Sequence, residues 1–262
     1  MISPPVVTTF GLPLDAVTRE AMVARVDQVI ADGSAVWLTF VNVAVLVQVM
    51  RDPQAGHTLQ KADYRLCDGM GLLYASRWLG EPLPEMVSGP YLLFRLLERA
   101  DAQGYSAYFL GGTPEVIEAA MTKVRHLYPR LRLAGYRDGF FTEDQQTEVV
   151  AEIRASRAQL LFVGMGFPRE RLFLAEQRAA LGVPVCMDVG GAFTVLAGIH
   201  QLAPLWVRRL GLEWVYRMLQ EPQRLWRRYL VTNLVFGGWL LRALWKKALA
   251  GSRDKSARHA RY

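Results

Sequence analysis

The chain has 262 residues, of which 52% are hydrophobic and 21% charged, and its formal net charge is +7. This length allows one large domain with a sizeable core, or one domain with an appendage. The two cysteines, Cys67 and Cys186, each end an apolar run, so we expect buried free thiols in a reducing compartment rather than a disulfide framework.

In the first half of the chain, short apolar runs alternate with segments of helical periodicity. Strands are predicted at residues 6–10, 35–41 and 64–67. Helices are predicted at residues 15–31, 44–50, 55–61, 70–79 and 90–103.

The second half is more regular. Strands are predicted at residues 106–110, 131–134, 160–163 and 183–187. Helices are predicted to begin at Pro114 and to cover residues 143–156 and 168–181, with a short one ending at Ala197. Strands that alternate with helices in this way predict an α/β fold, with a mostly parallel, Rossmann-like sheet and helices on both faces.

The charge is distributed unevenly along the chain. Residues 204–262 contain 13 Lys or Arg and three acidic residues, a net charge of +10, interleaved with Trp and Leu. This predicts three parts: a core over 1–203, a basic amphipathic helical appendage over 204–250, and a disordered basic tail over 251–262. A basic, aromatic-rich end favours a polyanionic or membrane-surface partner.

No segment predicts export or membrane insertion. The first residues have neither a basic region nor an apolar run of the kind found in secretory signals. Within the basic C-terminal part, the longest uncharged run covers residues 229–241, 13 residues, whereas a membrane span needs roughly 20. We therefore expect a cytoplasmic protein that touches a membrane from its inner face.

Glycines follow four of the predicted strands. Because ligands bind at the carboxyl ends of parallel strands, where glycine lets backbone N–H groups approach a phosphate, this pattern favours a phosphate-bearing ligand. For each of these glycines, the alternative is an ordinary turn that binds no ligand. The glycines are Gly69, Gly111, Gly112, Gly164, Gly166, Gly190 and Gly191.

Two polar residues at the same edge are candidates for chemistry. Asp68 follows a strand on a tight turn, where it could act as a general base, or it could simply cap the next helix. Asn42 could orient a sugar hydroxyl or cap a helix. A P-loop, a dinucleotide fingerprint, a pair of histidine ligands and an Asp-x-Asp motif are all absent from the sequence, so we expect neither a cofactor nor a metal.

In the appendage, Pro222 is expected to break the basic helix. Beyond it, Arg224 and Arg228 share one helix face, with Arg227 beside them. Apolar residues over 230–245 suit a helix lying in the bilayer interface. The alternative is a helix packed on another subunit of a homo-oligomer.

Several longer motifs resemble one family. They are Leu66–Gly71, Phe109–Gly112, Gly190–Phe193 with Ala197-Gly198, and above all the block from Gly211 through Arg217 and Pro222 to Tyr229. Over about residues 6–230 the sequence resembles the WecG/TagA/CpsF family of bacterial glycosyltransferases.

The resemblance implies inverting, metal-independent transfer of a sugar from a UDP-sugar to a polyprenyl-diphosphate-linked acceptor. The products would enter surface polysaccharide such as exopolysaccharide, teichoic acid or common antigen. By the same resemblance Asp68 is the base, Asn42 matches the asparagine that the family has after the second strand, and Arg217, Arg224 and Arg227 face a diphosphate. The glycine turns, with Glu170 and Thr194, would hold the nucleotide sugar.

The sequence departs from the family pattern at several places. Phe40 lies two residues before Asn42, where the family commonly has threonine. Met86 replaces an arginine, Glu170 a glutamine and Thr194 an aspartate, and Leu202 stands where the family has arginine. Phe40, Met86 and Glu170 motivate a second hypothesis, a catalytically degenerate, membrane-bound scaffold in polysaccharide assembly. A nucleic-acid binder is disfavoured, because no RNA-binding motif accompanies the arginines.

Overall fold

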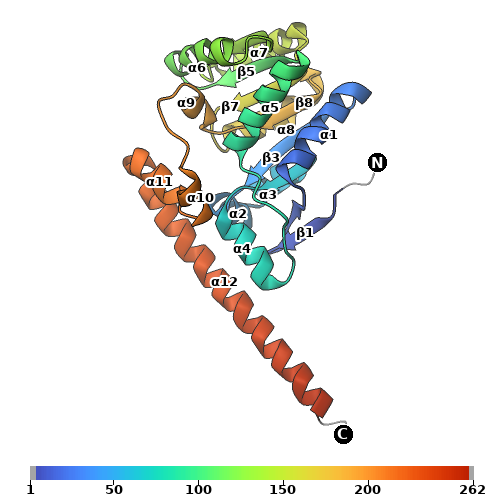
Figure 1. Cartoon of the computed structure of the whole chain (residues 1–262), viewed down its shortest axis with the longest axis vertical. Helices are drawn as coiled ribbons and strands as arrows, with labels where there is room; N and C mark the ends of the chain where they lie inside the picture. The colour runs from blue at the N-terminus through green and yellow to red at the C-terminus, as the bar shows by residue number, and fades with distance from the viewer. Residues whose placement is uncertain (1–3, 260–262) are drawn as a thin grey trace.

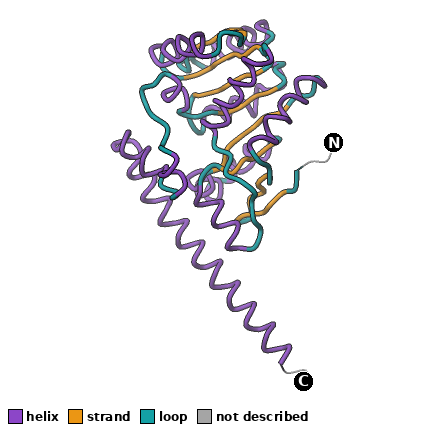
Figure 2. The backbone as a smooth tube through the Cα atoms, in the orientation of Figure 1, coloured by secondary structure: helices purple, strands orange, loops and turns teal. Residues whose placement is uncertain are grey.

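The computed structural model describes residues 4–259, except for the side chains of Arg224 and of residues 250–259. Its centre is a six-stranded parallel sheet in the order β4-β3-β8-β7-β5-β6 (Figure 2). The strands are β3 (Val36–Val41), β4 (Tyr64–Cys67), β5 (Ser106–Gly111), β6 (Arg132–Arg137), β7 (Leu160–Gly164) and β8 (Val185–Asp188).

Helices cover both faces of this sheet (Figure 1). Successive side chains of a strand point to opposite faces of the sheet, and in β7 both faces are apolar. Leu160 and Phe162 belong to one buried cluster, and Leu161 and Val163 belong to another. The first cluster includes α1 (Arg19–Asp32), α5 (Gly89–Gln103), α6 (Pro114–Leu127) and α9 (Ala192–Leu196). The second includes α7 (Glu143–Ser156) and α8 (Arg169–Leu181). The predicted α/β fold is confirmed.

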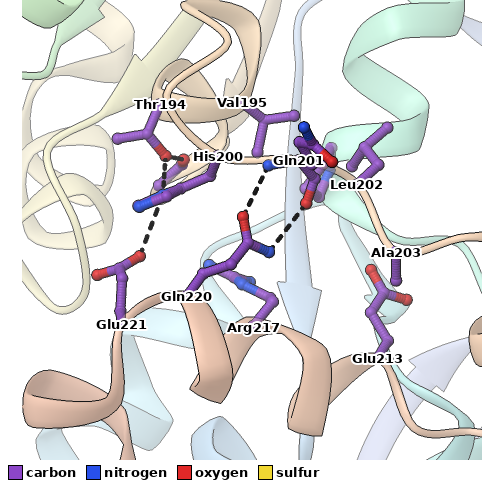
Figure 3. A pocket seen from close by; sticks show the side chains of 12 residues that line it. Thr194, Val195, His200, Gln201, Leu202, Ala203, Glu213, Arg217, Gln220 and Glu221 are labelled. Atoms are coloured by element: carbon purple, nitrogen blue, oxygen red, sulfur yellow. Dashed lines mark hydrogen bonds and ion pairs between the residues drawn. The ribbon is translucent and has the colours of Figure 1, made fainter.

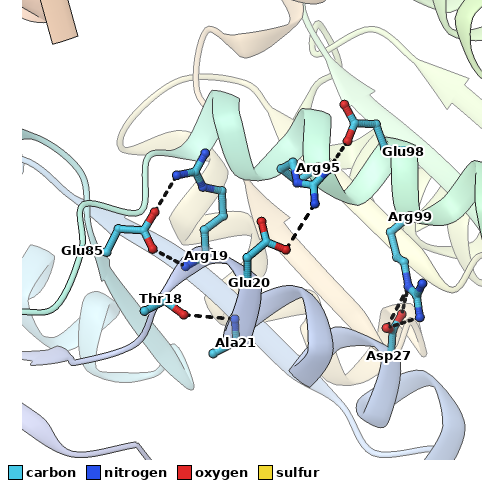
Figure 4. Close-up of polar contacts among 9 residues, drawn as sticks. All are labelled: Thr18, Arg19, Glu20, Ala21, Asp27, Glu85, Arg95, Glu98 and Arg99. Atoms are coloured by element: carbon cyan, nitrogen blue, oxygen red, sulfur yellow. Dashed lines mark hydrogen bonds and ion pairs between the residues drawn. The ribbon is translucent and has the colours of Figure 1, made fainter. Parts of the chain in front are cut away.

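Polar contacts join α1 to α5 and to the loop that precedes it (Figure 4). Arg99 pairs with Asp27 at 2.8 Å, and Arg19 with Glu85 at 2.5 Å. Exposed pairs of this kind contribute about 0–1 kcal/mol each. The buried apolar side chains between the helices and the sheet therefore carry most of the stability.

The N-terminal segment differs from the prediction. The expected strand is present as β1 (Val6–Thr9), but a second strand, β2 (Leu12–Asp15), follows and pairs with it antiparallel. Phe10 and Gly11, with φ of 53° and 79°, form the tight turn between them. Helix α1 therefore begins at Arg19 after the Thr18 cap, and not at residue 15 as predicted.

Three helices lie near β4, the strand that Asp68 follows. They are α2 (Val43–Arg51), α3 (Pro53–Gln60) and α4 (Met70–Leu79).

Cys67, at the end of β4, and Cys186, on β8, are both buried free thiols, as predicted. Burial raises the pKa of each thiol to about 12, so both remain protonated at neutral pH.

The C-terminal quarter forms α10 (Leu205–Arg209), α11 (Glu213–Gln220) and α12 (Pro222–His259). Pro222 begins α12, which confirms the predicted break. The 38 residues of α12 span about 57 Å, and the C-terminal part projects away from the core (Figure 1). Among the described residues, no helix has both the length and the apolar character needed to cross a bilayer.

One face of α12 packs against the core. Phe236 is 7% exposed and shares a buried cluster with residues of α2 and α4. Its ring lies 5.5 Å from that of Phe10, and Lys247 Nζ donates to the carbonyl of Trp78 at 3.0 Å. The proposed division at residues 203/204 and the disordered tail over 251–262 stay predictions; the backbone of residues 251–259 continues α12, and residues 260–262 lie outside the described part.

Candidate active site

A cavity of about 400 Å³ lies between the core and the C-terminal helices. The core contributes side chains from the carboxyl ends of β3 and β4, and the C-terminal quarter contributes side chains from α11 and α12. Among the lining residues are Asn42, Asp68, Gly69, Ser88, Glu213, Arg217, Tyr229 and Asn233.

Asp68 follows β4, and its N–H donates to the carbonyl of Val41 at 2.8 Å, which fixes the turn. The carboxylate accepts hydrogen bonds from the side chains of Ser88 and Asn42 and faces the charge of Arg217. Burial outweighs these interactions and raises the pKa of Asp68 above its usual value. A carboxylate with a raised pKa is a stronger base, which suits proton abstraction from a hydroxyl.

Asn42 combines the two roles that the sequence left open. Its Oδ1 accepts from the N–H of Val45 at 3.0 Å, which caps α2. Its amide also hydrogen-bonds to the Asp68 carboxylate. Asn42 therefore ties the orientation of Asp68 to the start of α2.

Glu213 is a second carboxyl group in this cavity, and the sequence analysis did not single it out. Burial, followed by the charge of Asp68, raises the pKa of Glu213 to about 7. The guanidinium groups of Arg217 and Arg208 and the nearby hydroxyl of Tyr91 oppose the shift. Glu213 stands four residues before Arg217, so helical spacing within that motif would have placed both on one face.

The glycine turns share the carboxyl edge of the sheet, but they are spread along it. Four strand spacings separate β4 from β5, about 19 Å. Gly111 and Gly112 are not among the residues that line the Asp68 cavity. A Cβ on Gly111 would lie 2.3 Å from the carbonyl oxygen of Gly164, so close strand packing alone requires glycine here.

Two other turns are held by Glu170. The N–H groups of Gly166 and Gly190 donate to Glu170 Oε2 at 3.1 and 3.0 Å. Glu170 is only 3% exposed, and burial, with the charge of Asp188, raises its pKa to about 8. Glycine N–H groups expected to face a phosphate are therefore engaged by a side chain of the chain itself.

A small second cavity adjoins the first (Figure 3). Glu213 and Arg217 line both cavities, and Gly191 and Thr194 line only the second. A Cβ on Gly191 would lie 3.6 Å from Arg217 Nη2. Arg217 therefore spans the distance between Asp68 and the turn after β8.

The other two predicted arginines are not placed in this way. The side chain of Arg224 lies outside the described residues, and Arg227 is exposed on α12. Within the part of the chain that the structure describes, no group of three or more His, Cys, Asp or Glu could hold a metal ion. The independence of the reaction from a metal stays a prediction.

Comparison with known proteins decides the family. The glycosyl transferase WecG/TagA/CpsF family matches residues 7–250. The chain belongs to this family. Two relatives carry the name N-acetylglucosaminyldiphosphoundecaprenol N-acetyl-beta-D-mannosaminyltransferase. The protein of Bacillus spizizenii is 34% identical over 189 residues, 72% of each chain, and that of Bacillus subtilis is 29% identical over 193 residues, 74% of each.

The resemblance inferred from the motifs is thus confirmed, as is the prediction that the protein is a glycosyltransferase. Two residues that depart from the common family pattern, Phe40 and Met86, pack in or against the core of the protein. Phe40 is 5% exposed, and its ring would lie 3.4 Å from a Cβ on Gly89. Met86 packs beside the buried cluster that includes Phe236.

Proposed function

We propose that this glycosyltransferase moves a hexose from a UDP-sugar to a polyprenyl-diphosphate-linked glycan, with inversion and without a metal, in the synthesis of a bacterial surface polysaccharide. The names of the two relatives support N-acetylmannosamine as the sugar and N-acetylglucosaminyl-diphosphoundecaprenol as the acceptor. The UDP group is the donor nucleotide that the family resemblance implies.

One observation carries the chemistry: a partly buried, base-strengthened carboxylate faces a cavity that also holds an arginine. In this proposal Asp68 accepts the proton of the acceptor hydroxyl. The hydroxyl oxygen attacks the anomeric carbon, and the bond from that carbon to the UDP oxygen breaks on the opposite face. UDP leaves with the bonding electrons, and the configuration inverts.

Charge on the departing diphosphate needs cations close by. Arg217 is suitably placed, because it lines both cavities and lies near Gly191. For Arg224 and Arg227, on the first turns of α12, the role at the diphosphate rests on the family resemblance alone. Thr194 lines the cavity on the Gly191 side, where a nucleotide sugar would extend.

The acceptor is a lipid, so the enzyme must meet a membrane surface. The outer face of α12 carries an exposed apolar stripe, defined as Trp226, Leu230, Leu234, Leu241 and Trp245, which are 50–70% exposed. Such a stripe flanked by Arg and Lys suits a helix lying in the interface of an anionic bilayer. We therefore place the enzyme on the inner face of the cell membrane, with the cavity of Asp68 close to the lipid surface.

The test is UDP release from UDP-N-acetylmannosamine in the presence of a lipid-linked N-acetylglucosaminyl-diphosphate acceptor. Asp68→Asn should lower the rate by about 10²–10⁴-fold and leave UDP binding intact, because only the proton acceptor is lost. Asp144→Asn, at an exposed position on α7, is the control. Turnover of Asp68→Asn at the wild-type rate would reject the assigned base.

The alternative is a degenerate scaffold that binds the membrane without transferring sugar, suggested by Phe40, Met86 and Glu170. It predicts no UDP release with any donor in a broad panel, together with retained membrane binding.

A further inference from the structure

Helix α11 carries Glu213 and Arg217, and its apolar packing is limited: the ring of Trp214 lies 5.9 Å from that of Tyr229 on α12. The structure describes all eight of its residues, and none of them is buried. A short helix held only by its ends would let Arg217 shift relative to the turn after β8. The position of α11 therefore depends also on contacts made by its polar side chains.

The first of these contacts is a reciprocal pair between the core and α11 (Figure 3). The N–H of Gln201 donates to Gln220 Oε1 at 2.8 Å, and Gln220 Nε2 donates to the carbonyl of Gln201 at 3.1 Å. Only a side chain that both donates and accepts can satisfy the two backbone groups at once. Gln220 lies three residues after Arg217, on the same side of the helix.

A second bridge lies beside the first (Figure 3). His200 Nδ1 is 2.9 Å from Thr194 Oγ1 and 3.3 Å from Glu221 Oε1. The hydroxyl of Thr194 donates to the carbonyl of Gly191 at 2.8 Å. The N–H of Glu221 donates to the carbonyl of Arg217 at 3.1 Å. The bridge thus links Gly191, the residue that Arg217 faces, to the C-terminal end of α11, the helix that carries Arg217.

We propose that these five residues, Thr194, His200, Gln201, Gln220 and Glu221, form a polar clasp, and that Gln220 is a positioning residue that holds Arg217 over the Gly191 turn. The proposal rests on the function proposed above, because the diphosphate is what Arg217 would meet there. It adds a positioning role for Gln220, to which the proposed function assigns no contact with the sugar. Without the clasp, Arg217 keeps its charge but loses its fixed place.

The test replaces Gln220 by methionine, which keeps the length of the side chain and removes both hydrogen bonds. Gln223→Met, at an exposed position one turn further on, is the matched control. Backbone amides of residues 213–220 should exchange with solvent at least about tenfold faster in Gln220→Met than in the wild type or the control. Unchanged exchange overturns the clasp, even if no sugar is transferred by any variant.

Kinetics then separate positioning from a general loss of structure. Gln220→Met should lower kcat/KM for transfer by roughly tenfold, because about two neutral hydrogen bonds are lost. In an Arg217→Lys background the same change should have at most about a twofold effect, since a flexible ammonium depends less on the helix position than a planar guanidinium. Equal losses in both backgrounds would show that Gln220 does not act through Arg217. A wild-type enzyme without transfer would reject the proposed function, while the exchange rates still decide the clasp.

Discussion

Glu170 is the best residue for a quantitative test, because its carboxyl is buried and its surroundings are well defined. Glu170→Gln keeps the shape of the side chain and an oxygen that accepts from the N–H groups of Gly166 and Gly190. It removes only the ionisation. The same substitution restores the glutamine that is common in the family.

The size and sign of the effect follow from the raised pKa. The carboxyl titrates near 4.5 in the unfolded chain and at about 8 in the folded protein. The folded protein therefore holds the proton more tightly, so the stability that this proton gives is fully present below pH 4.5 and is lost as the pH rises to about 8. The loss over this window is on the order of 4 kcal/mol.

Urea unfolding followed by circular dichroism, repeated from pH 5 to pH 8, measures this directly. Glu170→Gln should have a flatter pH dependence than the wild type and be more stable at pH 8, by about 2 kcal/mol or more. Glu176→Gln, exposed on the same helix, should follow the wild type. The reasoning is refuted if Glu170→Gln and the wild type lose stability in parallel across the window.

Three further predictions concern other parts of the structure. Because Glu213 ionises at about pH 7 beside Asp68, UDP binding by the wild type should weaken as the pH rises through 7. In calorimetric titrations over pH 6–8, Glu213→Gln should show a smaller weakening than the wild type. Gly111→Ala should destabilise the protein by about 3 kcal/mol or more in thermal unfolding, because its Cβ would overlap Gly164, while Gly237→Ala, with open space around its Cβ, should gain up to about 1 kcal/mol. Leu234→Glu should reduce sedimentation with anionic vesicles several-fold, and Gln103→Glu, far from the stripe, should not.

Much of the core could be predicted because its signals are local. The β5 and β7 runs are continuously apolar and end at glycine, and Thr113-Pro114 marks the start of α6 by its cap. The β1–β2 hairpin was missed because Leu12-Pro13-Leu14-Asp15 is short and contains a proline, which weakens a strand assignment. Its pairing depends instead on left-handed backbone at Phe10, a conformation that the sequence does not reveal.

The site was only partly predictable for a different reason. Asp68 and Asn42 follow adjacent strands, so their meeting could be inferred from parallel topology alone. Glu170 was grouped with the glycines as a ligand-binding residue, but its side chain fills the space between the turns of Gly166 and Gly190. Which side chain occupies a strand-end turn depends on how α8 packs, and spacing along the chain carries no information about that.

Helix α12 explains why charge alone could not define the limits of the C-terminal part. Its outer face carries the exposed apolar stripe, while Leu225 and Phe236 on its inner face are only 3% and 7% exposed. Deleting residues 230–262 would therefore expose Phe10 and the cluster around α2 and α4 as well as removing the stripe. Loss of membrane binding in such a truncation would not separate lipid contact from damage to the core. Single substitutions on the stripe do separate them, because these side chains already lie in solvent and their replacement leaves the inner face in place.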